Sequence, residues 1–209
     1  IRDAQESRGL GDVYKRQMEK EQYRFTWDDE TYTYPSLIYP LIDKIEAFRE
    51  RKWKTKQELT IWLPFDTVDD VEFQDFVVEK SNYYKILKEQ GYNVITSHIA
   101  TGQDFFEYQP ESFDLIISNP PFKNKKAFFE KALSFKKPFA LVGPASWLND
   151  WGCYDLFYNI KLQLFMPRTR PKFFRNWEPI WKMPSFKAIY FCYDFLEQDI
   201  EWFLLDKSL

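Results

Sequence analysis

The segment of residues 113–118, "FDLIIS", is the feature that most constrains the fold of this chain. Leu115, Ile116 and Ile117 follow one another without an intervening polar residue. Such a run is typical of a parallel strand covered on both faces, which occurs almost only in α/β proteins. The strand must end at Asn119, because the two prolines that follow cannot continue a hydrogen-bonded ladder.

The rest of the chain alternates between helical and strand-like segments. Helices are predicted from apolar spacing and end signals at residues 34–52, where Pro40 interrupts the pattern, 81–91 and 125–135. Strands are predicted at residues 58–63, 92–99, 113–118, 138–144, 160–166 and 186–195. This alternation predicts an α/β fold with a doubly wound, mostly parallel sheet and helices on both faces. Ligands bind beyond the carboxyl ends of the strands in such sheets.

Length and composition suit one folded domain. The chain has 209 residues, of which 44% are hydrophobic and 20% aromatic, so it is neither disordered nor fibrous. No run of 18 apolar residues occurs, so we expect no membrane span. Residues 1–17 lack apolar periodicity and resemble a translated sequencing-adapter fragment, and a flexible native tail is the alternative. We expect a leader of that kind, a start at Met18 and a single domain over residues 18–209.

Cysteine and histidine content bears on compartment and metal chemistry. Cys192 lies in an apolar strand-like run and Cys153 follows a glycine. We expect two free thiols in a reducing, cytoplasmic compartment, with a disulfide as the alternative. His98 is the sole histidine, so a zinc site of His and Cys is not expected.

The turn after the central strand reads Asn119-Pro120-Pro121-Phe122. Proline fixes its own φ and holds the preceding residue extended, so two prolines make a stiff turn. The side-chain oxygen of Asn119 and the carbonyl of Pro120 then form a rigid pair of acceptors, which matches an NH2 group. Phe122 offers a flat face on which a planar base can stack. A surface turn that merely carries this tetrapeptide is the alternative.

In this context the tetrapeptide resembles the Asp/Asn/Ser-Pro-Pro-Tyr/Phe motif of S-adenosylmethionine-dependent adenine-N6 amino-methyltransferases. The likeness is greatest to small phage and mobile-element enzymes, and it covers roughly residues 31 to 195. It implies a Rossmann-like methyltransferase fold, S-adenosylmethionine as cofactor and a catalytic turn that grips the adenine amine. It implies DNA as substrate. RNA and a cofactor-less nucleic-acid-binding module of the same fold stay open as alternatives.

The resemblance places the first cofactor-binding stretch at the end of the strand near residue 63. Pro64, Phe65 and Asp66 stand where the family has an acidic, glycine-rich loop, but this chain has no glycine there. Asp66 is expected to accept a hydrogen bond from the ammonium group of the cofactor. An ordinary strand end with a capping aspartate is the alternative.

Two further stretches are placed by the same resemblance. Asp104 and Phe105 are expected to bind the amine and the ring of the cofactor's adenine, with a helix-capping Asp before a buried Phe as the alternative. Tyr34 and Pro35 are expected to close over the cofactor, although an ordinary helix entry would look the same.

The distribution of charge points to a polyanionic partner. Residues 119–187 contain 13 Lys and Arg against four Asp and Glu, a net charge of +9, whereas the whole chain carries −3. Bases alternate with aromatic residues over residues 167–186, a pattern that suits nucleic acid. A solvated loop whose aromatic residues pack into the core is the alternative. The expected phosphate contacts are Lys123, Arg168, Arg170, Lys172 and Arg175.

Overall fold

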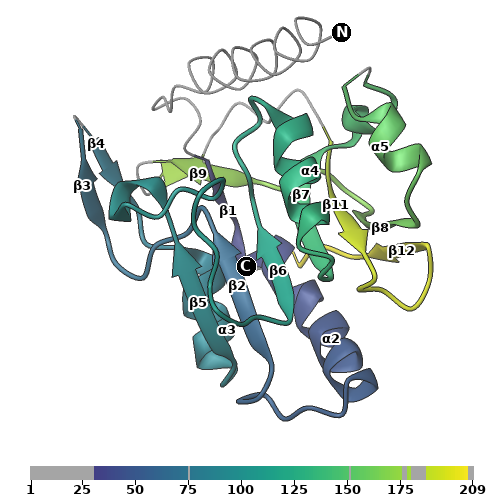
Figure 1. Ribbon diagram of the computed structural model, residues 1–209, viewed down its shortest axis with the longest axis horizontal. Coiled ribbons are helices and arrows are strands. Elements are labelled where there is room, and N and C mark those ends of the chain that lie inside the picture. Colours follow the sequence, from purple (N-terminus) through teal and green to yellow (C-terminus); the bar gives the residue numbers. More distant parts are fainter. Residues whose placement is uncertain (1–30, 75, 151, 176–177, 180–186, 207–209) are drawn as a thin grey trace, which may run out of the picture.

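A seven-stranded sheet forms the centre of the protein, in the strand order β12-β8-β11-β7-β6-β2-β5 (Figure 1). This computed structural model describes residues 31–206 except residues 75, 151, 176–177 and 180–186, so the expected leader lies outside the described residues. The strands are β2 (Thr60–Pro64), β5 (Asn93–Ser97), β6 (Leu115–Ser118), β7 (Phe139–Pro144), β8 (Leu162–Pro167), β11 (Ala188–Tyr193) and β12 (Ile200–Phe203).

The sheet is mixed, and β11 is its one antiparallel strand. β5, β2, β6 and β7 pair in parallel, and so do β8 and β12. β11 lies between β7 and β8 and runs antiparallel to both of them. The carboxyl ends of the six parallel strands therefore meet at one edge, where β11 begins. The predicted α/β fold with a mostly parallel sheet is confirmed.

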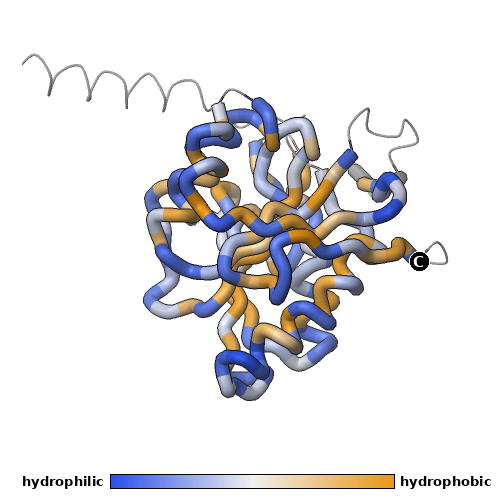
Figure 2. The backbone as a smooth tube through the Cα atoms, turned by 90° about the vertical axis from the view of Figure 1, so that its right-hand side faces the viewer, coloured by the Kyte–Doolittle hydropathy of each residue, from blue (hydrophilic) through white to orange (hydrophobic). Residues whose placement is uncertain are grey.

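Helices cover both faces of the sheet (Figure 1). α2 (Pro35–Arg51) and α3 (Asn82–Glu89) pack on one face, and α4 (Lys125–Ser134) and α5 (Tyr154–Tyr158) pack on the other. Successive residues of a strand enter opposite cores: Ile61 packs with α2 and α3, whereas Trp62 packs with α4. This explains the continuous apolar runs, which Figure 2 shows passing through the middle of the molecule.

Two smaller sheets flank the central one. β1 (Tyr32–Thr33), β9 (Phe173–Arg175) and β10 (Glu178–Pro179) form an antiparallel sheet, in which Thr33 pairs with Phe173. β3 (Val71–Phe73) and β4 (Phe76–Val78) form a hairpin that projects beside β5 (Figure 1). The 3-10 helices η2 (Ile99–Thr101) and η3 (Ala145–Asn149) follow β5 and β7.

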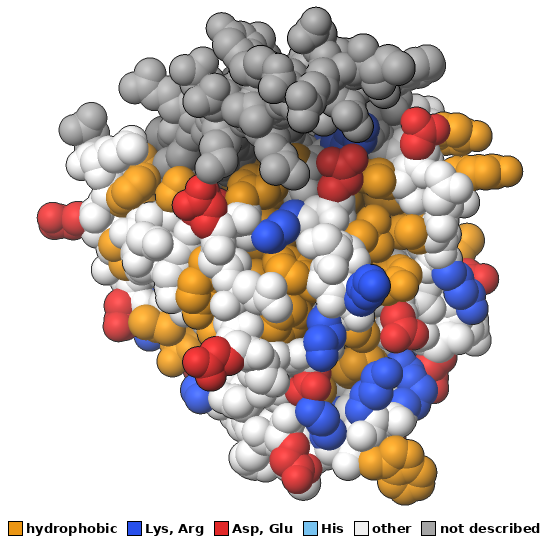
Figure 3. All heavy atoms as spheres, in the orientation of Figure 1, with side chains coloured by type: hydrophobic (Ala, Val, Ile, Leu, Met, Phe, Trp, Pro, Cys, Tyr) orange, Lys and Arg blue, Asp and Glu red, His pale blue; other side chains and the backbone are white. Residues whose placement is uncertain are grey.

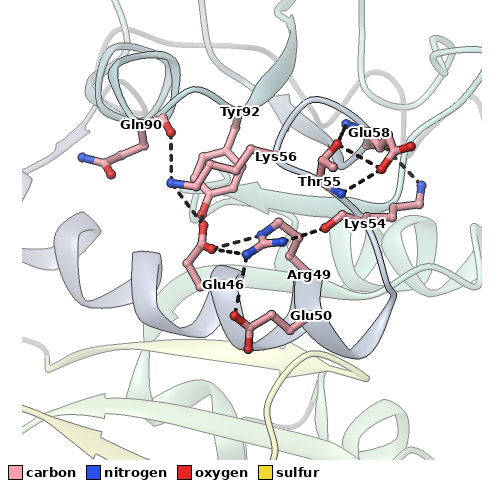
Figure 4. A network of polar contacts seen from close by, with 9 residues as sticks. All are labelled: Glu46, Arg49, Glu50, Lys54, Thr55, Lys56, Glu58, Gln90 and Tyr92. Atoms are coloured by element: carbon pink, nitrogen blue, oxygen red, sulfur yellow. Dashed lines mark hydrogen bonds and ion pairs between the residues drawn. The ribbon is translucent and has the colours of Figure 1, made fainter.

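A polar network closes the opposite, amino edge of the sheet (Figure 4). The Glu46 carboxylate of α2 accepts hydrogen bonds from Arg49, 2.7 Å away, and from the Tyr92 hydroxyl, and it pairs with Lys56 at 3.3 Å. Burial alone would raise the pKa of Glu46, but these hydrogen bonds outweigh it and lower the pKa. The network fixes the end of α2 against the segments that enter β2 and β5.

Both cysteines are free and buried, as the sequence predicted. Burial raises the pKa of both thiols, and the pKa of Cys192, which lies inside β11, rises more than that of Cys153. A buried thiol that stays protonated packs as a small apolar group, so neither cysteine is placed as a nucleophile.

Candidate active site at the carboxyl edge of the sheet

The Asn-Pro-Pro-Phe turn follows β6 directly, in the middle of the carboxyl edge. Ser118, the last residue of β6, donates its hydroxyl to the carbonyl of Pro64 and lies 3.1 Å from a carboxylate oxygen of Asp66. The backbone N–H of Asp66 donates to the carbonyl of Ser97 at the end of β5. The ends of three neighbouring strands are thus tied together around Asp66.

The Asn119 side chain has one fixed orientation. Its Nδ2 donates to the backbone carbonyl of Thr31 at 2.7 Å. A carbonyl only accepts hydrogen bonds, so the NH2 group must face Thr31 and Oδ1 must point away from it. Oδ1 is buried and has no hydrogen-bond partner among the described residues. An unpaired buried acceptor costs about 1–3 kcal/mol, so such atoms mark sites where a ligand donates.

Asn119 lines a small cavity, which we call the acceptor pocket, with a volume of about 30 Å³. Thr33, Asp66, Tyr83 and Asn119 supply polar groups to it, and Phe65 is among its apolar lining. Thr33 Oγ1 is also buried without a hydrogen-bond partner. No Lys, Arg or His of the described residues lines the pocket. The Asp66 carboxylate and the amide oxygen of Asn119 are acceptors that suit an amine or an ammonium group.

Two buried tyrosines set the direction of the hydrogen bonds below the acceptor pocket. The Tyr190 hydroxyl donates to the carbonyl of Leu37, so in its 2.8 Å contact with Tyr83 it must accept. Burial raises the pKa of Tyr83, so its hydroxyl stays protonated at neutral pH.

Phe65 follows β2 with a φ of +73°. This left-handed conformation costs a residue with a side chain about 1–2 kcal/mol, and glycine adopts it freely. The position thus has the backbone geometry of a glycine loop, although the residue is Phe. The ring is held by Phe105 at 4.9 Å and by Phe128 at 5.0 Å.

Asp104 and Phe105 line a second cavity of about 20 Å³, the Asp104 cavity, together with Phe65 and Pro121. Oδ1 of Asp104 accepts from the backbone N–H of Phe106 at 3.0 Å, so the carboxylate caps the next turn. Its other oxygen remains an acceptor. Phe105 is buried against Trp62 and Phe65. Asp104 therefore caps a turn and not the helix of the alternative interpretation, because no helix of the described residues directly follows it, and its expected role toward the cofactor stays a prediction.

Phe122 packs edge-on against Trp147 of η3, with ring centroids 5.5 Å apart and an interplanar angle of 90°. Its ring is half-buried, and the aromatic cluster under α4 supports it. Trp147 is buried and was not predicted as part of the site. Its position directly after the carboxyl end of β7 is the signal that could have found it.

Tyr34 and Pro35 form the entry to α2, with Tyr34 as the extended N-cap residue and Pro35 in the first turn. Neither lines the acceptor pocket. The residues just before them do: Thr31 holds Asn119, and Thr33 contributes its hydroxyl. His98 caps η2, where its Nδ1 accepts from the N–H of Ala100 at 2.9 Å, as expected for a structural histidine.

The predicted nucleic-acid residues lie further along the same edge. Arg168, Arg170 and Lys172 line a cavity of about 730 Å³, together with Lys187 and Trp202. We call this cavity the basic groove. Lys123 is exposed in the loop after Phe122. Arg175 belongs to β9, but its side chain lies outside the described part of the structure.

No protein-family model matches the sequence, and no curated protein matches it significantly. None of the described helices is both long and apolar enough to cross a bilayer. Within the described residues, no three His, Cys, Asp or Glu side chains group closely enough to hold a metal ion.

Proposed function

We propose that the protein transfers a methyl group from S-adenosylmethionine to the N6 amine of adenine in DNA. One observation carries the proposal: the buried, unpartnered Oδ1 of Asn119, oriented by Thr31 beside the Asp66 carboxylate. This acceptor lies at the end of the central strand, where ligands of doubly wound sheets bind.

Asn119 and Pro120 would act by holding the target amine. The lone pair of an exocyclic adenine amine is delocalised into the ring, so the amine is a poor nucleophile. Two acceptors that take both hydrogens draw the nitrogen towards tetrahedral geometry and localise the lone pair. Phe122, backed by Trp147, would stack on the base. Positioning of this kind can lower a barrier by about 7–11 kcal/mol.

The chemistry of the lining fits S-adenosylmethionine. Asp66 would accept a hydrogen bond from its ammonium group, and Asp104 and Phe105 would contact its adenine. When bound, the cofactor supplies an activated methyl group. The cofactor can enter only after a side chain moves, because the acceptor pocket holds about 30 Å³ and the Asp104 cavity about 20 Å³. Small-molecule sites hold about 300–1,000 Å³. Phe65 lines both cavities, so its ring must leave before the cofactor can bridge them.

A second candidate is favoured by that same small volume. If the Phe65 ring stays in place, the chain is a nucleic-acid-binding module that has a methyltransferase fold and no cofactor. Incubation with methyl-labelled S-adenosylmethionine and either DNA or tRNA separates the candidates. We expect labelled N6-methyladenine from DNA after digestion. Label in tRNA alone would move the substrate to RNA, and no label in either would favour the binding module.

Phe65→Gly is expected to strengthen binding of S-adenosylmethionine. Glycine adopts the left-handed φ without strain, and no ring has to leave its contacts with Phe105 and Phe128. Each aromatic contact is worth about 0.5–1.5 kcal/mol, so the affinity should rise by about fivefold or more. Isothermal calorimetry of the wild type and the variant measures this.

The matched control is Gln74→Gly, which relieves a φ of +56° in the turn between β3 and β4 without touching either cavity. Its affinity should equal that of the wild type. Weaker binding by Phe65→Gly would mean that the ring packs on the cofactor.

The double variant Arg168→Ala/Arg170→Ala is expected to weaken DNA binding and flatten its salt dependence. Each phosphate contact contributes about 0.9 to the slope of log affinity against log salt on duplex and about 0.7 on single strands. Loss of two contacts should lower the slope by about 1.8 on duplex and by about 1.4 on single strands. Lys85→Ala/Lys88→Ala, on exposed positions of α3, removes the same charge away from the groove. Equal slopes for the two double variants would mean that residues 168–170 form a solvated loop that does not bind phosphates.

A further inference from the structure

The basic groove follows the carboxyl edge from β7 to the outermost strand. Its lining comes from the residue after β7 (Ala145), the residue before β11 (Lys187), the residue after β8 (Arg168) and β12 (Trp202). Four adjacent strands at about 4.8 Å spacing extend over about 14 Å. The volume of about 730 Å³ is more than ten times that of the acceptor pocket. The groove begins one strand away from the Asn-Pro-Pro-Phe turn.

Cations dominate the charged lining of the groove. Arg168, Arg170, Lys172 and Lys187 are exposed, and none forms an ion pair with a carboxylate of the described residues. Asp206 is the acid in the lining. On the face drawn in Figure 3, by contrast, Lys and Arg lie interspersed with Asp and Glu. Four convergent cations attract a ligand with several negative charges.

The groove also has an aromatic and apolar wall. The Trp202 side chain is 63% exposed, and in the register of the sheet it lies opposite Met166 of β8. Met166, Ile189 and Leu205 line the groove beside it. A duplex presents phosphates and sugars at its surface and keeps its base faces stacked inside. An exposed indole in the same groove as the cations therefore fits a ligand that has both phosphates and open base faces.

We propose that the basic groove binds a short run of unpaired nucleotides, with phosphates on Arg168, Arg170 and Lys187 and a base stacked on Trp202. This proposal rests on the proposed function in one respect: the bound strand is the one that carries the target adenine. The protein therefore acts on adenines in single-stranded or locally opened nucleic acid.

The groove and the catalytic turn are joined through β1 and β9. Lys172, in the groove, directly precedes β9, and β9 pairs with β1. The residue before β1 is Thr31, whose carbonyl holds the Asn119 amide. The groove is thus connected, through the pairing of β9 with β1, to the segment that orients Asn119.

Fluorescence anisotropy with labelled oligothymidylate of about 15 nucleotides, near the upper site size of single-strand binding folds, tests the proposal against a duplex of equal length. We expect the wild type to bind the single strand more tightly than the duplex. Trp202→Leu should weaken single-strand binding by about 5- to 150-fold, as expected for loss of one stacked base, and leave duplex binding unchanged. Trp202→Phe should retain most of the affinity.

Trp53→Leu is the matched control, because Trp53 is 94% exposed and lies just beyond the end of α2, at the opposite edge. Duplex binding as tight as single-strand binding would overturn the groove proposal, and so would equal affinities for Trp202→Leu and Trp53→Leu. Trp202-dependent binding of single strands without any methyl transfer would instead overturn the proposed function and leave the groove proposal standing.

Discussion

Asn119→Ala is expected to lower methyl transfer by at least about a hundredfold, the usual cost of removing one preorganised group at a reacting centre. The variant loses the buried acceptor that we propose holds the target amine. Steady-state turnover at saturating S-adenosylmethionine and DNA is the measurement.

The cofactor affinity of the same variant should change little, because Asp66 and Asp104 remain. Asn159→Ala, just after the end of α5, is the matched control: it removes an amide that donates to the carbonyl of Asp155 in its own helix. Turnover of Asn119→Ala within about tenfold of the wild type would contradict the catalytic assignment.

Gly143→Ala is expected to destabilise the fold and to impair the site together. A Cβ at this position of β7 would lie inside contact distance of the Trp147 ring, which is buried. The ring must move, and it is held edge-on by Phe122 and Phe129. Overpacking of this kind costs about 1–3 kcal/mol. The displaced Trp147 would also shift Phe122 away from the position where we expect the base to stack.

Urea unfolding and methyl transfer, measured on the same preparation, test both parts of this expectation. In thermal unfolding, Tm should fall by about 2–4 °C for each kcal/mol of lost stability in a chain of this size. Gly152→Ala is the control, because the nearest atom to its new Cβ is Lys126 Cβ at 3.9 Å, an ordinary contact. If both variants unfold at the same urea concentration, the Trp147 ring accommodates the new methyl group without cost. The expected link between fold stability and the position of Phe122 is then absent.

The central part of the fold was predictable because its strands are apolar on both faces. β2, β5, β6, β7, β8 and β11, with α2, α3 and α4, lie where the sequence predicted them. β12 was missed because Ile200 and Trp202 are exposed and only Phe203 is buried, so the segment lacks a buried run. β1 and β9 were missed because strands of two and three residues form only through pairing between distant parts of the chain.

The site was predictable where its chemistry is local in sequence. Asn119 to Phe122 are adjacent in the sequence and form a recognisable motif, and Asp66, two residues beyond the end of β2, was placed by the resemblance to the methyltransferase family. The Thr31 carbonyl that orients Asn119 is a backbone group, and any residue could provide it. Trp202 follows the last predicted strand, so nothing in the sequence connected it with Arg168. Phe65 was unexpected in another way, because its left-handed backbone is a property of the folded loop.

The position of β11 has a consequence for how the chain is built during synthesis. β8 is made before β11 but has no place beside β7 until β11 has inserted between them. β12 in turn joins the sheet only through β8. While the ribosome adds residues 168 to 193, the edge of β7 stays open and β8 stays unpaired, and both are exposed to association with other chains. A nascent chain that stops before β11 therefore lacks two strands in sequence, β11 and β12, and three in the sheet, because β8 cannot join it.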